Sequence, residues 1–111
     1  MGNYKVVKQA ISYELANFLF NYFLLKREAV AHMYDTNMTY DSGMLGTWKD
    51  DQIPNTYSIY GDPAFDTLLM KVLPIMKRET GLEVVPTYSY ARLYKHGDEL
   101  KRHKDLSLIH I

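Results

Sequence analysis

The sequence predicts an α+β domain in which helices come first and strands follow. Two apolar patterns with helical spacing precede an alternating, tyrosine-rich run at residues 87–94. The chain has 111 residues, enough for about one small domain with a single core. With 47% hydrophobic and 14% aromatic residues, the composition is that of a folded rather than a disordered chain.

The first helix is expected at residues 13–34. Ser12 can cap its free backbone N–H groups, and Glu14 lies in the first turn, where its charge suits the helix dipole. Apolar residues then recur at helical spacing, namely Leu15, Phe18, Leu19, Tyr22, Phe23 and Val30. Because Phe20, Leu24 and Leu25 widen this arc, we expect the helix to be well covered. His32 is interpreted as a polar residue of this helix, not as a metal ligand.

Residues 35–51 are expected to form a loop, since Asp, Asn, Ser and Gly punctuate them. Trp48 has two open roles there: an anchor that pins the loop to the core, or a wall of a binding mouth. A short strand is predicted after Pro54 from its β-favouring residues, Thr56, Tyr57, Ile59 and Tyr60.

A second helix is expected to begin at Asp62 and Pro63, an N-cap followed by a proline at the first helical position. Its apolar stripe comprises Phe65, Leu68, Leu69, Val72, Leu73 and Met76. Pro74 lies inside this stripe and predicts a kink or a break, because its ring clashes with the preceding turn. Gly81 is a natural residue to end the helix.

Residues 87–94 alternate as a strand does. One face would carry Tyr88, Tyr90, Arg92 and Tyr94, and the other Ser89, Ala91 and Leu93. We expect the small face to pack on the helices and the Tyr/Arg face to line a site. A turn is predicted at residues 95–98, where Gly97 can adopt positive φ.

Composition excludes several classes of protein. Thirteen basic residues balance thirteen acidic ones, which disfavours a protein that mainly binds nucleic acid or an anionic membrane. The chain has no cysteine, so a metal site must use His, Asp or Glu. The start lacks the apolar region of a secretory signal, and residues 16–25 are too short an apolar run to span a bilayer. We expect a soluble, cytoplasmic protein.

The candidate chemistry lies at His103 and Asp105. In an extended segment, residues two apart point the same way, so this imidazole and carboxylate can converge on one ion. With one further His, they would form the facial triad of non-haem Fe(II) oxygenases. His96-Gly97-Asp98 has the same spacing, but it spans the predicted turn, and we interpret it as structural.

The run Arg92-x-Tyr94-x-x-Gly97-x-x-Leu100-x-x-His103-x-Asp105 resembles the first metal-binding segment of iron(II)- and 2-oxoglutarate-dependent dioxygenases. The likeness is to the prolyl 4-hydroxylase-like group and its phage and marine bacterial relatives, and it extends over about residues 12–105. It implies a double-stranded β-helix, or jelly roll, with helices packed outside its first strands.

The resemblance also implies cofactors. His103, Asp105 and a distal His would bind Fe(II). The iron would be chelated by 2-oxoglutarate, a small-molecule co-substrate, with ascorbate as a candidate reductant. Such enzymes couple decarboxylation of 2-oxoglutarate to hydroxylation of a C–H bond. Tyr94 matches a tyrosine that helps to hold 2-oxoglutarate in some relatives, although a role as a core aromatic stays open. The substrate and the oligomeric state are not indicated.

The pattern departs from the family after Asp105. Relatives continue through further strands to the distal His and a basic anchor for 2-oxoglutarate, whereas residues 106–111 read LSLIHI. These six residues are what a transposon end used as a sequencing adapter would encode. We therefore expect residues 1–105 to be the N-terminal part of an oxygenase domain that is inactive by itself, and residues 106–111 to be non-native.

The sequence allows two other functions. In a non-catalytic jelly-roll binding module, the tyrosine-rich face would bind a sugar or a peptide. Nucleic-acid binding would use Lys95, Lys101, Arg102 and Lys104, but acidic residues interrupt that patch and disfavour it.

Overall fold

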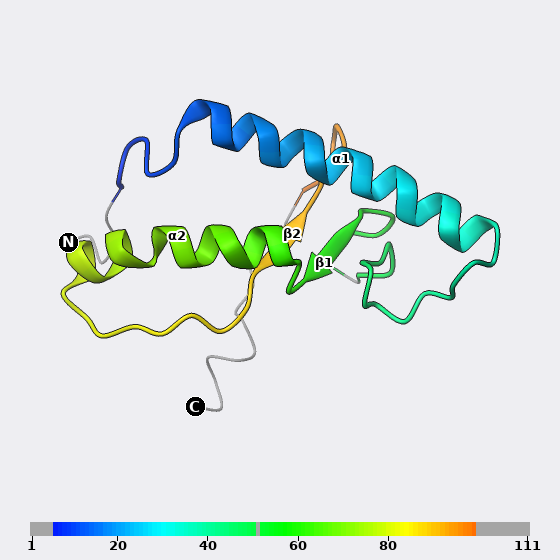
Figure 1. The fold of residues 1–111 in the computed structure, drawn as a ribbon. Helices are drawn as coiled ribbons and strands as arrows, with labels where there is room; N and C mark the ends of the chain where they lie inside the picture. Colours follow the sequence, from blue (N-terminus) through cyan, green and yellow to red (C-terminus); the bar gives the residue numbers. More distant parts are fainter. Residues whose placement is uncertain (1–5, 51, 100–111) are drawn as a thin grey trace.

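The computed structural model describes residues 6–50 and 52–99. Along the chain it contains helix α1 (Tyr13–Asp35), strand β1 (Ser58–Tyr60), helix α2 (Pro63–Thr80) and strand β2 (Tyr90–Arg92). In Figure 1, α2 lies below the N-terminal half of α1, and the two strands lie beneath the middle of α1. The predicted α+β class is confirmed, with one antiparallel sheet of two strands in the described part of the chain.

Helix α1 forms where the sequence predicts it. The Ser12 hydroxyl accepts a hydrogen bond of 3.0 Å from the Leu15 N–H, which satisfies one of the free donors of the first turn. Its buried stripe consists of Leu19, Phe23 and Val30. The expectation that α1 is well covered is wrong, because Phe20 and Leu25 are exposed.

The sheet joins two segments about thirty residues apart, with Ile59 opposite Ala91. The Leu93 N–H donates to the Tyr57 carbonyl at 2.9 Å, which extends the pairing beyond β2. Strand β2 itself is shorter than the predicted run at residues 87–94. The predicted faces are nonetheless confirmed, because Leu93 is buried and Ala91 packs on the core, whereas Tyr88 and Tyr90 are exposed.

The core lies between α1 and the sheet. It contains Phe23 and Val30 from α1 together with Tyr57, Ile59 and Leu93. Trp48 packs against this cluster, with ring centroids 4.7 Å from Tyr57 and 6.0 Å from Tyr34. Of its two open roles, the structure therefore supports the anchor.

Helix α2 begins and ends as predicted but does not break. The Asp62 carboxylate accepts from the Ala64 N–H at 2.8 Å, and Gly81 closes the helix in the left-handed conformation, at φ 69°. The helix runs through Pro74, so a break there is wrong. Pro74 is exposed and so is Met70, so the Met70 carbonyl that loses its N–H partner lies on the solvent side.

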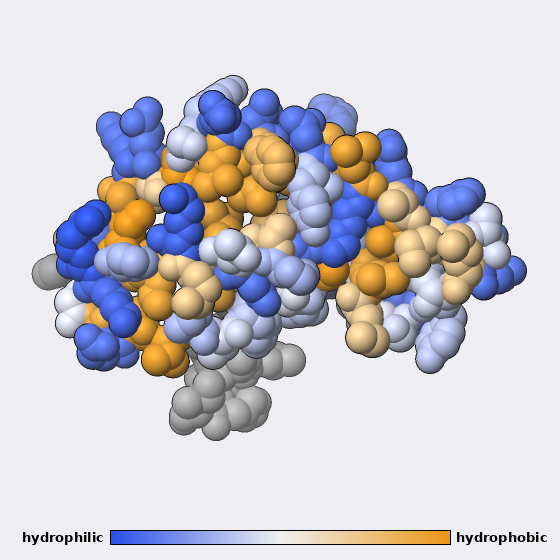
Figure 2. Space-filling view, in the orientation of Figure 1, coloured by the Kyte–Doolittle hydropathy of each residue, from blue (hydrophilic) through white to orange (hydrophobic). Residues whose placement is uncertain are grey.

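No residue of α2 is buried. Apolar side chains gather over the N-terminal half of α1 and along α2 in Figure 2. The most exposed of the large ones on these helices are Tyr13, Phe18, Leu25, Met70 and Phe20.

Candidate functional site

The predicted site begins where β2 leaves the sheet. Leu93 points into the core, so alternation along the strand sends Tyr94 to the opposite face. Tyr94 is 51% exposed, so it does not belong to the core formed by the described residues. Its phenol thus lies on the same face as Tyr90 and Arg92.

The turn after Tyr94 is held by the carboxylate of Asp98. This group accepts from the Lys95 N–H at 2.6 Å and from the Thr56 hydroxyl at 3.0 Å, and the Asp98 N–H donates to the Lys95 carbonyl at 2.9 Å. Gly97 has φ 89°, as the turn requires. The bond from the Lys95 N–H, followed by the contacts with Thr56 and the Lys95 ammonium, lowers the pKa of Asp98.

These contacts show the role of one of the two His-x-Asp pairs, His96-Gly97-Asp98. The carboxylate of Asp98 ties the turn to the segment before β1, while His96 is exposed. The structural interpretation of His96-Gly97-Asp98 is therefore supported. Among residues 6–50 and 52–99, no group of three or more His, Asp or Glu side chains is arranged to hold a metal. His103 and Asp105 lie outside the described residues.

A second polar cluster, which we did not predict, lies on the Tyr/Arg face. Arg92 donates from Nη2 to Asp50 at 2.8 Å, and the Tyr90 hydroxyl donates to the same carboxylate at 2.7 Å. The Arg92 side chain is only 4% exposed. Its Nη1 is buried and has no hydrogen-bond partner in the described part of the chain.

The charges in this cluster stabilise each other. Burial acts to raise the pKa of Asp50, but hydrogen bonds from Tyr90 and the Gln52 N–H, together with the Arg92 charge, outweigh it and lower the pKa. Asp50 is thus a carboxylate at neutral pH, and the Asp50–Arg92 pair has no net charge. Alternation put Tyr90 and Arg92 on one face, but no signal in the sequence identified Asp50 as their partner.

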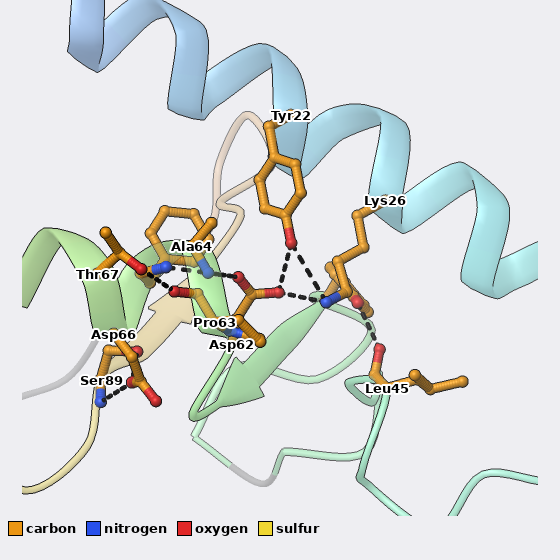
Figure 3. Close-up of polar contacts among 11 residues, drawn as sticks. Tyr22, Lys26, Leu45, Asp62, Pro63, Ala64, Asp66, Thr67 and Ser89 are labelled. Carbon is orange, nitrogen blue, oxygen red and sulfur yellow. Dashed lines mark hydrogen bonds and ion pairs between the residues drawn. The ribbon is translucent and has the colours of Figure 1, made fainter.

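A third cluster joins the two helices, as Figure 3 shows. Tyr22 and Lys26 of α1 both donate to Asp62 Oδ2, the tyrosine at 2.7 Å, while Oδ1 caps α2. Burial opposes the charge on Asp62, yet the hydrogen bonds from Lys26 and Tyr22 lower its pKa. Burial likewise opposes the charge on Lys26, and the Asp62 carboxylate raises the pKa of the ammonium above its ordinary value. Every group here has a partner, so the cluster is a tie between helices.

No protein-family model, curated protein or solved structure that we compared with the chain matches it. In the described part of the chain, neither helix is long and apolar enough to cross a membrane.

Proposed function

We propose that the chain belongs to an Fe(II)- and 2-oxoglutarate-dependent dioxygenase, a hydroxylase with a jelly-roll domain. The observation that carries the proposal is the pair His103 and Asp105, which follows a strand and a glycine turn in the pattern of that family. An imidazole and a carboxylate form a donor set that Fe(II) accepts, and a distal His would complete the facial triad. When bound, the iron and 2-oxoglutarate supply the oxidising chemistry.

The described residues support two parts of this proposal. The strand and turn that the pattern requires are present at Tyr90–Arg92 and at Gly97. Tyr94 presents its phenol on the exposed face of that strand, where it can donate a hydrogen bond to a bound carboxylate. His103 and Asp105 would hold the metal, and Tyr94 would orient the co-substrate.

Succinate release from 2-oxoglutarate tests the proposal. The protein expressed from the re-sequenced, uninterrupted gene is incubated with Fe(II), ascorbate and 2-oxoglutarate. We expect release that falls by more than about a hundredfold in His103→Ala and in Asp105→Ala, because each variant loses a metal ligand. His96→Ala is the matched control, since it removes the exposed histidine of the other His-x-Asp pair, and it should retain activity.

Two results would contradict the proposal. One is succinate release that persists in both ligand variants. The other is native DNA with a stop codon directly after Ile111, which would leave no distal ligand and would make the expected continuation wrong.

A further inference from the structure

Strand β2 has one hydrogen-bonding edge that no other strand covers in the described part of the chain. On its other edge it pairs with β1, where the Leu93 N–H donates to the Tyr57 carbonyl at 2.9 Å. Because backbone groups alternate in direction along a strand, the N–H and C=O groups of Tyr90 and Arg92 point away from β1. Within residues 6–50 and 52–99, β2 has no second neighbour on that side.

The opposite edge of the sheet is covered. Thr47 and Ser58 exchange two backbone hydrogen bonds, of 2.8 and 3.0 Å, which pair the loop before β1 with the outer side of β1. The first turn of α2 also meets β2 from the β1 side, because Asp66 binds the Ser89 N–H while the Ser89 carbonyl accepts from the Gly61 N–H. Among the residues that the structure describes, the sheet therefore has a single open edge, and an open edge is a template for a further strand.

The sequence of β2 does not protect this edge. Soluble proteins often block an open strand edge with lysine or proline. Residues 88–94 contain neither, and their one charged side chain, Arg92, is 4% exposed and paired with Asp50. Tyr88 and Tyr94, at the two ends of the run, are instead about half exposed. The edge thus has the composition of a strand that pairs.

We propose that the open edge of β2 pairs antiparallel with β2 of a second copy, which gives a two-fold dimer with one continuous sheet. The outward backbone groups set the register: Tyr90 pairs with the partner subunit's Arg92, and Arg92 with the partner subunit's Tyr90. The two-fold axis then passes beside Ala91. With a single open edge per copy in the described residues, this pairing closes as a dimer and does not extend to a filament.

The run at residues 88–94 is self-complementary in this register. Its sequence, YSYARLY, reads nearly the same in both directions from Ala91. Tyr88 lies opposite the partner subunit's Tyr94, and aromatic cross-strand pairs stabilise antiparallel sheets. Ala91 lies opposite the partner subunit's Ala91 in a closely spaced pair, which a small side chain suits. The charged Arg92 meets a tyrosine, so no like charges oppose each other. These pairs favour a second copy over an unrelated strand.

Sedimentation velocity of the 111-residue protein over a concentration series tests the dimer, and paired charge substitutions test its register. Residues 88 and 94 are about 20 Å apart along one strand but lie opposite each other across the proposed axis. Tyr88→Lys/Tyr94→Lys should weaken the dimer at least about tenfold, because like charges then face each other. Tyr88→Lys/Tyr94→Glu places opposite charges there and should bind about tenfold more tightly than the double-lysine variant.

A matched pair of variants controls for net charge. Tyr88→Lys/Tyr13→Lys and Tyr88→Lys/Tyr13→Glu differ by the same charge, but Tyr13 is 90% exposed on α1, away from the proposed contact. These two variants should dimerise with similar affinity. Far-UV circular dichroism confirms that each variant is folded.

A cysteine at the axis gives an independent measurement, since the chain has none of its own. The Cα atoms of a closely spaced antiparallel pair lie about 4.5 Å apart, within reach of a disulfide. Mild oxidation should therefore cross-link Ala91→Cys faster than Met44→Cys, whose position is 81% exposed in the loop before β1. This comparison keeps the proposal testable if the lysine variants unfold.

Three results would overturn the proposal. The first is a monomer at every concentration, whatever covers the edge. The second is a dimer that the double-lysine and lysine–glutamate variants form equally well, which would place the contact elsewhere. The third is cross-linking of Ala91→Cys that is no faster than that of Met44→Cys. The inference uses neither His103 nor Asp105, so it goes beyond the oxygenase proposal and stands or fails separately from it.

Discussion

At the scale of single residues, Asp62 is central to the structure, because it joins the two helices. Its buried carboxylate caps α2 and binds Tyr22 and Lys26 of α1, so one side chain fixes the start of one helix against the flank of the other. We expect Asp62→Asn to keep the cap, since Asn is a good N-cap, but to leave the Lys26 ammonium without a counter-ion. The free energy of unfolding in urea should fall by about 2 to 3 kcal/mol.

Glu83→Gln is the matched control for that change. Glu83 pairs with Lys77 at 3.8 Å, but its side chain is 94% exposed, so solvent screens the pair. Its loss should cost less than about 0.5 kcal/mol. Equal costs in the two variants would show that the Asp62 tie contributes no more than a surface ion pair.

The stability of the fold depends on pH through Asp62 and two other carboxylates. The pKa values of Asp62, Asp50 and Asp98 are all lowered in the folded chain. A lowered folded pKa contributes stability above the unfolded pKa, about 4, and this contribution is lost as the pH falls through the folded value. The free energy of unfolding should therefore decrease below about pH 4. Asp62→Asn should flatten this decrease, and an unchanged slope would contradict the role given to Asp62.

At the scale of elements, the loop before β1 depends on two glycines that differ in surroundings. Both have positive φ, 87° for Gly43 and 96° for Gly46, so an alanine is strained at either position. A Cβ at Gly43 meets no atom within 4 Å, whereas one at Gly46 would lie 2.4 Å from the buried ring of Tyr57.

Gly43→Ala should thus cost about 1 kcal/mol, which is backbone strain alone. Gly46→Ala adds the displacement of a core ring and should cost about 3 kcal/mol or more. Thermal unfolding of the pair isolates the effect of the contact, because the strain is common to both. Similar melting temperatures would mean that Tyr57 does not lie against Gly46.

Helix α2 offers a test of local strain. Pro74 removes one backbone hydrogen bond from a helix that otherwise runs without interruption. Because Pro74 is exposed, Pro74→Ala should restore that bond without loss of packing and raise the free energy of unfolding by about 1 to 3 kcal/mol. Unfolding followed by the helical circular dichroism signal measures this gain, and a loss of stability would contradict it.

At the scale of the whole molecule, features that depend on neighbouring residues could be predicted from the sequence, whereas contacts between distant residues could not. The caps at Ser12 and Asp62, the end at Gly81 and the turn at Gly97 were predictable because each depends on chemistry within a few neighbouring residues. The bonds from Tyr22 to Asp62 and from Tyr90 to Asp50 each join residues 40 apart, and no periodic pattern encodes such partners.

The burial of each helix could not be predicted either, because it depends on residues that are distant in the sequence. An apolar stripe shows that a helix has a face to bury, but it does not say what lies on that face. The stripe of α2 is present as predicted, yet none of its residues is buried. Alternation along the strand predicted the exposed side on which Tyr94 lies, whereas the partner of Arg92 could be found only from the fold.

We propose that His103 and Asp105 bind iron, and an anaerobic Fe(II) titration tests this proposal most directly. The protein expressed from the uninterrupted gene should bind Fe(II), with affinity reduced by at least about a hundredfold in His103→Ala and Asp105→Ala and retained in His96→Ala. The alternative of a non-catalytic binding module predicts no specific Fe(II) site. A wild-type protein that does not bind Fe(II), or ligand variants that bind it as tightly as the wild type, would contradict the claim.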